Sequence, residues 1–170
     1  MKNKTSTVQL TKIGLLAAVY TAVSLLLQPL SFGPVQFRVA EALTILPVVT
    51  PTAVGGLTLG CFLTNLLGLF MGANPAGAWD VLLGTAATGI AAVLTYWLRN
   101  IRIKNLPILS TVPPVLVNAL VVGGELSLVY GTPFWANALW VGVGQVAACT
   151  VCGLLLFWLL EKTGAVKQLK

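Results

Sequence analysis

The sequence predicts an all-α membrane protein of six transmembrane helices with both termini in the cytoplasm, and three observations support this fold class. Apolar residues make up 57% of the 170 residues and charged residues only 8%, whereas soluble chains carry about a quarter charged residues. The apolar residues form long runs, and most of the basic residues gather in clusters outside those runs. This composition excludes a soluble enzyme and a nucleic-acid-binding module.

The long apolar runs define the expected spans, because a helix needs about 20 mainly apolar residues to cross a bilayer. Five runs are close to this length or exceed it: residues 13–30, 54–71, 79–98, 108–130 and 134–160. The first run follows three lysines, as in a signal peptide, but its length and the lack of a following Ala-x-Ala site predict a retained helix. Six spans would use roughly 120 residues, so we expect residues 1–170 to form a single integral membrane domain.

The short apolar segment at residues 37–49 decides the predicted topology. As an α-helix it would rise only about 20 Å, yet the positive-inside rule requires it to cross. Two long runs separate the last two basic clusters, and three separate the first two, so all three clusters share one side only if residues 37–49 also span. The clusters are Lys2, Lys4 and Lys12; Arg99, Arg102 and Lys104; and Lys162, Lys167 and Lys170.

The remaining charges are predicted to lie at similar depth in the outer half of the bundle. A charge inside a span costs about 2.5 kcal/mol or more, so such residues rarely persist without a partner or a role. We expect a polar, aromatic-lined pocket open to the outside, and its three carboxylates against one arginine favour a cationic or donor-rich ligand. The charged residues are Arg38, Glu41, Asp80 and Glu125, joined at this level by Gln36, Asn65, Asn137, Trp79 and Trp140.

Structural explanations exist for the same residues. Arg38 and Glu41 are spaced i, i+3 and could pair with each other, and Asp80 could cap the fourth helix. Gly123 and Gly124, just before Glu125, either let the helix open or allow close helix packing.

The chain lacks the residue types of several chemistries. It has no histidine, so the spacing of Cys149 and Cys152 is attributed to small core residues and not to a metal or redox site. No phosphate-binding P-loop motif occurs. We therefore expect no catalytic residue, metal or cofactor, and a binding subunit that obtains energy from a partner. Ala18 and Ala22, one helical turn apart, allow close contact with another helix.

Three segments carry a resemblance to a known family. Residues 33–47 read Gly-Pro-Val-Gln-Phe-Arg-Val-Ala-Glu-Ala-Leu-Thr-Ile-Leu-Pro, Trp79-Asp80 opens the fourth span, and Gly123-Gly124-Glu125 lies in the fifth. Over nearly its whole length the chain resembles the queuosine-precursor transporter family, the substrate-binding S components of energy-coupling factor (ECF) transporters. The resemblance implies a six-helix S-component bundle in the bacterial cell membrane. It also implies partners, a transmembrane T component contacted through Ala18 and Ala22 and two cytoplasmic ATPase subunits.

The resemblance further implies a 7-deazaguanine ligand such as pre-queuosine 1 or pre-queuosine 0. Carboxylates suit it, because they accept paired hydrogen bonds from a guanine edge. We expect Glu41 or Glu125 on that edge and Asp80 on the aminomethyl cation. Asn65 or Asn137 is expected on the carbonyl side, Arg38 is expected to pair with Glu41 or to contact the ligand carbonyl, and Trp79 and Trp140 are expected to line the site. A lid is expected from residues 31–36 or 72–78.

Two alternatives stay open at this point. An S component for another vitamin, such as riboflavin or biotin, would have the same fold but a different set of polar residues. A ligand-free membrane scaffold would use the four outer charges only as structural pairs.

Overall fold

The computed structural model describes residues 2–33 and 36–169, and these residues are helical apart from turns, short connections and one isolated bridge between Ile103 and Leu106. The first half contains α1 (Lys2–Leu26), α2 (Gln28–Ser31), η1 (Val39–Val48), α3 (Thr52–Phe70), η2 (Asp80–Gly84), α4 (Thr85–Trp97) and η3 (Leu98–Asn100). The second half contains η4 (Ile108–Thr111), α5 (Val112–Tyr130), α6 (Phe134–Gln145), η5 (Val146–Cys152), α7 (Gly153–Lys162) and α8 (Val166–Leu169).

Five helical stretches are long and apolar enough to cross a membrane: Ser6–Leu26, Thr52–Phe70, Asp80–Asn100, Ile108–Tyr130 and Phe134–Lys162. The predicted all-α membrane fold is confirmed, and the later spans begin and end within a few residues of the predicted limits. The first span ends earlier than residue 30, because the helix stops at Leu26 and Pro29 lies at the start of the separate α2. Proline lacks the N–H that the interior of a helix requires, so it is tolerated at such a start.

The short segment forms η1, a 3₁₀ helix of 10 residues that contains Pro47. A 3₁₀ helix rises about 2.0 Å per residue, so η1 extends roughly as far as the α-helix expected from residues 37–49. It packs against α1, α4, η5 and α7, and most of its residues are buried. Runs of 3₁₀ helix this long are uncommon and often mark functional segments.

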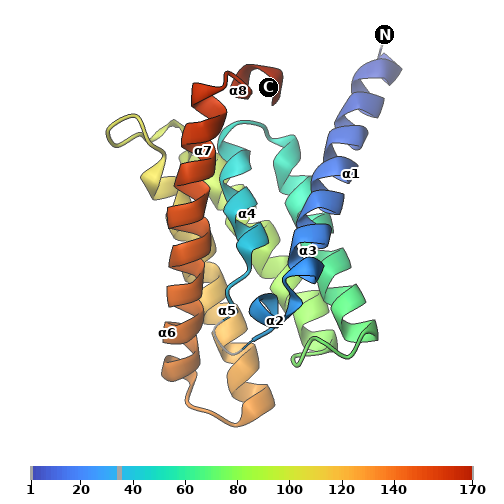
Figure 1. Cartoon of the computed structure of the whole chain (residues 1–170), viewed down its shortest axis with the longest axis vertical. Coiled ribbons are helices and arrows are strands. Elements are labelled where there is room, and N and C mark those ends of the chain that lie inside the picture. Colours follow the sequence, from blue (N-terminus) through green and yellow to red (C-terminus); the bar gives the residue numbers. More distant parts are fainter. Residues whose placement is uncertain (1, 34–35, 170) are drawn as a thin grey trace.

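The two chain termini lie at the same end of the helical bundle (Figure 1). A direct contact joins these regions, because Lys12 Nζ donates a hydrogen bond to the Leu169 carbonyl oxygen at 3.1 Å. Lys162 lies in the last turn of α7 and Lys167 in α8, so this end is called the basic end of the bundle.

Glycines allow the helices next to the polar residues to approach closely. A Cβ at Gly60 of α3 would lie 2.8 Å from the Cβ of Tyr20 in α1. A Cβ at Gly123 of α5 would lie 2.7 Å from the Cα of Ala138 in α6. Since α5 also continues through Gly123 and Gly124 without a break, close packing explains Gly123, whereas a Cβ at Gly124 would make only an ordinary contact, 3.8 Å from a ring carbon of Phe134.

Candidate ligand-binding site

A buried ion pair lies at the start of η1. Arg38 Nη2 is 2.7 Å from Asp80 Oδ2, and both side chains are almost completely buried. The same Asp80 oxygen accepts a hydrogen bond from Asn74 Nδ2 at 2.9 Å. Arg38 also donates to the Ser31 carbonyl oxygen at 3.3 Å, and its guanidinium lies 5.3 Å from the ring centre of Phe32.

The predicted Arg38–Glu41 pair is therefore wrong, because Arg38 pairs with Asp80. The i, i+3 rule applies to residues within one helix, but Arg38 precedes η1 in an extended conformation. Its side chain consequently reaches Asp80 at the start of η2. The alternative role of Asp80 as a helix cap is not seen either, since η2 shows no side-chain capping hydrogen bond.

The backbone at Asp80 is adapted to hold a carboxylate. Asp80 begins η2, a π-helical turn, and such turns are frequent at functional sites. Asn65 Nδ2 donates to the Asp80 carbonyl oxygen at 2.7 Å. A Cβ at Gly84 would collide with Asp80 Oδ1, so a glycine at this position leaves the space that the carboxylate occupies.

Glu41 lies in a separate part of the buried network. Its carboxylate accepts one hydrogen bond from the Tyr20 hydroxyl and a second from Asn118 Nδ2 at 3.5 Å. These contacts join α1, η1 and α5. Glu41 is thus already supplied with neutral donors from the protein.

Glu125 differs from the other carboxylates. It is only 3% exposed, and neither of its oxygens receives a hydrogen bond from any residue that the structure describes. Burying a carboxylate without a partner is costly, so an unpartnered one is a strong candidate for a ligand contact.

Other buried polar atoms near these residues in the chain also lack partners. Within the described ranges, Asp80 Oδ1 and Asn65 Oδ1 accept no hydrogen bond, and Gln36 Nε2 donates none. With the two Glu125 oxygens, four unpartnered oxygens can only accept and one amide nitrogen can only donate, whereas the unpartnered hydroxyls of Ser24, Thr64, Thr85 and Ser110 can do either. This imbalance suits a ligand that supplies several donors.

Several residues of the network were not predicted from the sequence: Tyr20, Phe32, Cys61, Asn74 and Thr88. The thiol of Cys61 lies 3.3 Å from Thr88 Oγ1, 3.5 Å from Asn65 Nδ2 and 3.9 Å from Arg38 Nη1. Tyr20, Cys61 and Thr88 lie in apolar helices, and Phe32 and Asn74 lie in connections between helices. Neither setting shows from the sequence which way the side chain points.

The predicted tryptophans do not lie with the buried carboxylates. Trp79 is 64% exposed and Trp140 is 57% exposed. Neighbouring positions on a helix face different directions, so the burial of Asp80 turns the adjacent Trp79 outward. Both side chains suit the aromatic belts of a membrane interface.

Asn137 has a local role in the structure. Its Nδ2 donates to Ser127 Oγ at 2.9 Å and to Thr132 Oγ1 at 2.7 Å. These bonds fix the connection between α5 and α6 and use both donor hydrogens of the amide. Of the remaining predicted site residues, Arg38, Asn65 and Asp80 are in direct contact, and Glu41 and Glu125 are also buried.

The two segments predicted as lids are described to different extents. In residues 31–36, Pro34 and Val35 lie outside the described residues, whereas Ser31 and Gln36 are buried. In residues 72–78, Asn74 is buried and attaches the loop to Asp80. This loop is therefore joined to the ion pair by a direct hydrogen bond, and its role as a lid stays a prediction.

The remaining predicted features are the small residues of α1 and the two cysteines near the C-terminal helix. Ala18 and Ala22 are exposed on α1, so they do not serve packing within the bundle. Cys149 and Cys152 are free, and the Cys149 thiol donates to Gln145 Oε1 at 3.0 Å. The described residues contain no group of three or more His, Cys, Asp or Glu side chains suited to a metal ion.

Comparison with known proteins adds a family assignment to this geometry. The family model described as QueT transporter matches residues 10–162. The chain is 30% identical over 88 residues to the queuosine precursor transporter QueT of Lactococcus lactis subsp. cremoris (strain MG1363), and the alignment covers 50% of this chain and 47% of that protein. The chain thus spans about half the length of the curated relative it matches. No solved structure gives a significant match.

Proposed function

Because the chain belongs to the QueT transporter family, we propose that it is the substrate-binding S subunit of an ECF importer that takes up a 7-deazaguanine queuosine precursor. Family membership and five apolar spans make it a multi-pass protein of the bacterial cell membrane. The observation that carries the proposal is the buried Glu125 carboxylate, which has no partner in the described part of the chain.

The hydrogen-bond donors of a guanine-like ligand are complementary to the unpartnered Glu125 carboxylate. A guanine-like ring presents adjacent N–H donors, and a carboxylate accepts them as paired, charge-assisted hydrogen bonds. Glu41 is less suited, because it already accepts from Tyr20 and Asn118. We therefore assign the guanine edge to Glu125.

The other contacts follow from the remaining free atoms. Asp80 Oδ1 accepts from the aminomethyl group of pre-queuosine 1, while Asp80 Oδ2 stays bound to Arg38 and Asn74. The free Nε2 of Gln36 donates to the ligand carbonyl, a role first expected of Asn65 or Asn137. Asn65 supports the site through its bond to the Asp80 backbone.

In the membrane, η1 crosses the bilayer in addition to the five long spans, which gives six spans and places both termini in the cytoplasm. Its rise of about 20 Å is short for a bilayer, but its neighbours shield it from lipid, and backbone buried in protein is tolerated at membrane depth. In intact cells, an impermeant maleimide should label Thr132→Cys and leave Lys104→Cys unlabelled until the membrane is opened. Labelling of Lys104→Cys in intact cells would contradict this topology.

The outer face of α1 binds the T component, and two ATPases attached to that component supply the energy. Ala18 and Ala22 are exposed, and a Cβ at Gly14, a further turn before them, would have no neighbour within 4 Å. Small residues one turn apart let a second membrane helix approach closely. Docking through this stripe would leave the ligand network, on the opposite side of α1 at Tyr20, undisturbed.

A thermal-shift titration of the purified chain tests the ligand assignment. The panel is pre-queuosine 1, pre-queuosine 0, guanine, riboflavin and biotin, since a ligand at 100 times its dissociation constant adds about 2.7 kcal/mol to the stability of the folded state. We expect shifts with the deazaguanines and none with riboflavin or biotin. A shift with a vitamin alone would overturn the ligand, and no shift with any compound would favour the scaffold alternative.

A further inference from the structure

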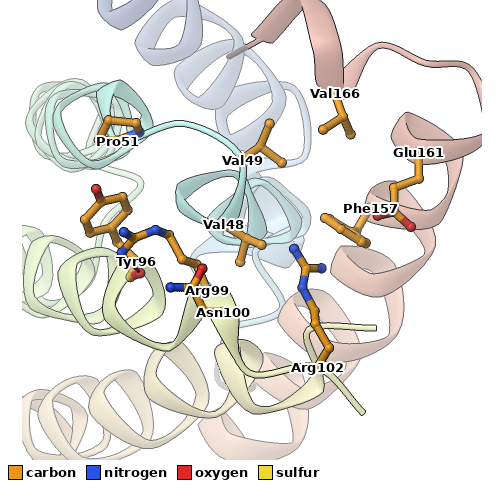
Figure 2. A pocket seen from close by; sticks show the side chains of 10 residues that line it. All are labelled: Val48, Val49, Pro51, Tyr96, Arg99, Asn100, Arg102, Phe157, Glu161 and Val166. Carbon is orange, nitrogen blue, oxygen red and sulfur yellow. Dashed lines mark hydrogen bonds between the residues drawn. The ribbon is translucent and has the colours of Figure 1, made fainter. Parts of the chain in front are cut away.

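A cavity lies at the basic end of the bundle, where η1 ends at Val48. It has a volume of about 300 Å³ and is lined by Val48, Val49, Pro51, Tyr96, Arg99, Asn100, Arg102, Phe157, Glu161 and Val166 (Figure 2). Because Arg38 precedes η1 and Val48 ends it, the cavity and the ion pair are separated by the length of this helix.

Two arginines of the cavity are held over aromatic rings. The Arg99 guanidinium lies 3.9 Å from the ring centre of Tyr96, and its Nη1 donates to the Tyr96 carbonyl oxygen at 2.9 Å. The Arg102 guanidinium lies 4.8 Å from the ring centre of Phe157. In Figure 2 the two guanidinium groups appear on either side of Val48.

These arginines have no carboxylate partner. In residues 2–33 and 36–169, the ion pair that the structure forms is Arg38–Asp80, so neither arginine is within ion-pair distance of Glu161, the one acidic residue in the lining. The lining keeps a net positive charge. Planar guanidinium groups have the donor geometry that phosphate oxygens require.

We propose that this cavity binds the phosphodiester headgroup of an anionic phospholipid. The chain lies in a bacterial membrane, and basic pockets between helices on the cytoplasmic side bind anionic lipid headgroups. Val48, Val49, Phe157 and Val166 give the cavity apolar walls, against which the glycerol and first methylene groups of a lipid pack. A small soluble ester such as sn-glycerol 3-phosphate has no acyl methylene groups to pack against these walls. This site is independent of the ligand site proposed above.

Native mass spectrometry of the delipidated chain tests the proposal. Phosphatidylglycerol and zwitterionic phosphatidylcholine are added in equal amounts, and sn-glycerol 3-phosphate is added as a soluble competitor. The wild-type chain should retain phosphatidylglycerol preferentially, and the preference should fall about fivefold for each of Arg99→Gln and Arg102→Gln. Lys104→Gln is the matched control, because it removes a charge from the same connection but Lys104 is exposed and does not line the cavity.

Each other outcome overturns the proposal. Equal loss of phosphatidylglycerol in Lys104→Gln would show general charge attraction, and no preference in the wild type would show that the cavity does not select anionic lipid. Displacement of the lipid by equimolar sn-glycerol 3-phosphate would show a soluble phosphate site. Thermal melts monitored by circular dichroism check that the variants are folded. Because Arg102 is exposed, Arg102→Gln is the substitution expected to disturb folding least.

Discussion

At the start of η1, Arg38 is buried and bound to Asp80 at 2.7 Å. Beyond the end of η1, Arg99 and Arg102 lie over aromatic rings and have no carboxylate partner among the described residues. Arg38 interacts with several elements at once, through an ion pair with Asp80, a hydrogen bond to Ser31 and a contact with the ring of Phe32. The arginines at the basic end are partly or fully accessible to solvent. The same residue type therefore serves tertiary structure at one end and is free for external partners at the other.

The largest effect on stability is expected from a substitution that breaks the Arg38–Asp80 ion pair. Asp80→Asn leaves Arg38 as an unpaired buried cation, which should lower the free energy of unfolding by about 3 kcal/mol. Arg99→Gln at the basic end is the matched charge removal and should change it by less than about 1 kcal/mol. Reversible unfolding in mixed detergent micelles measures both variants, and equal effects would contradict the difference between the two ends.

A second substitution separates ligand binding from stability. Glu125→Gln removes a buried carboxylate that receives no hydrogen bond in the described part of the chain, so the free energy of unfolding should not fall. Deazaguanine affinity should fall about tenfold or more, because a hydrogen bond to a charged group contributes about 1.5–3 kcal/mol. Titration calorimetry and the same unfolding assay check the two parts. Unchanged affinity would remove Glu125 from the ligand site.

The space around the Asp80 carboxylate can be tested with a methyl group. Gly84→Ala places a Cβ against Asp80 Oδ1 and should cost about 1–3 kcal/mol of stability, as overpacking does. Gly142→Ala on α6 is the control, since its Cβ would lie at an ordinary 3.6 Å from the Ala119 Cβ. If thermal melts show the two variants to be equally stable, the close fit at Asp80 is wrong.

A smaller loss of stability is expected when one of the two hydrogen-bond donors to Glu41 is removed. Tyr20→Phe removes one of them and leaves Asn118 Nδ2 at 3.5 Å, so the free energy of unfolding should fall by about 1–2 kcal/mol. Ser127→Ala, which removes a partly buried hydroxyl bonded to Asn137, provides a control away from η1. A greater loss in the control, measured by the same unfolding assay, would contradict the importance of the Tyr20–Glu41 contact.

The smallest effect on stability is expected on the face of α1 that points away from the bundle and carries Ala18 and Ala22. Ala18→Leu adds volume at an exposed position. The free energy of unfolding of the isolated chain should therefore stay within about 0.5 kcal/mol of the wild-type value. Copurification with the T component should nevertheless be lost, because the larger side chain separates the helices. Val19→Leu, also exposed, is the control that should keep the partner. Copurification of Ala18→Leu at wild-type yield would exclude this face as the docking surface.

The composition and spacing of the sequence were sufficient to determine the membrane class and the five long spans, whereas the sixth span and the depth of the four charges stay predictions. These properties depend on local hydropathy and on distance along the chain. The motif at residues 33–47 was likewise sufficient for the family, which the match over residues 10–162 shows.

The tertiary structure alone decided which of the buried residues meet. Arg38 pairs with Asp80 and not with the nearby Glu41, because it lies outside the helix that Glu41 occupies. Trp79 faces outward and Tyr20 inward, although both lie in apolar stretches. Helix rotation and 3₁₀ geometry set these directions through contacts between segments far apart in sequence, and hydropathy along the chain carries no information about such contacts.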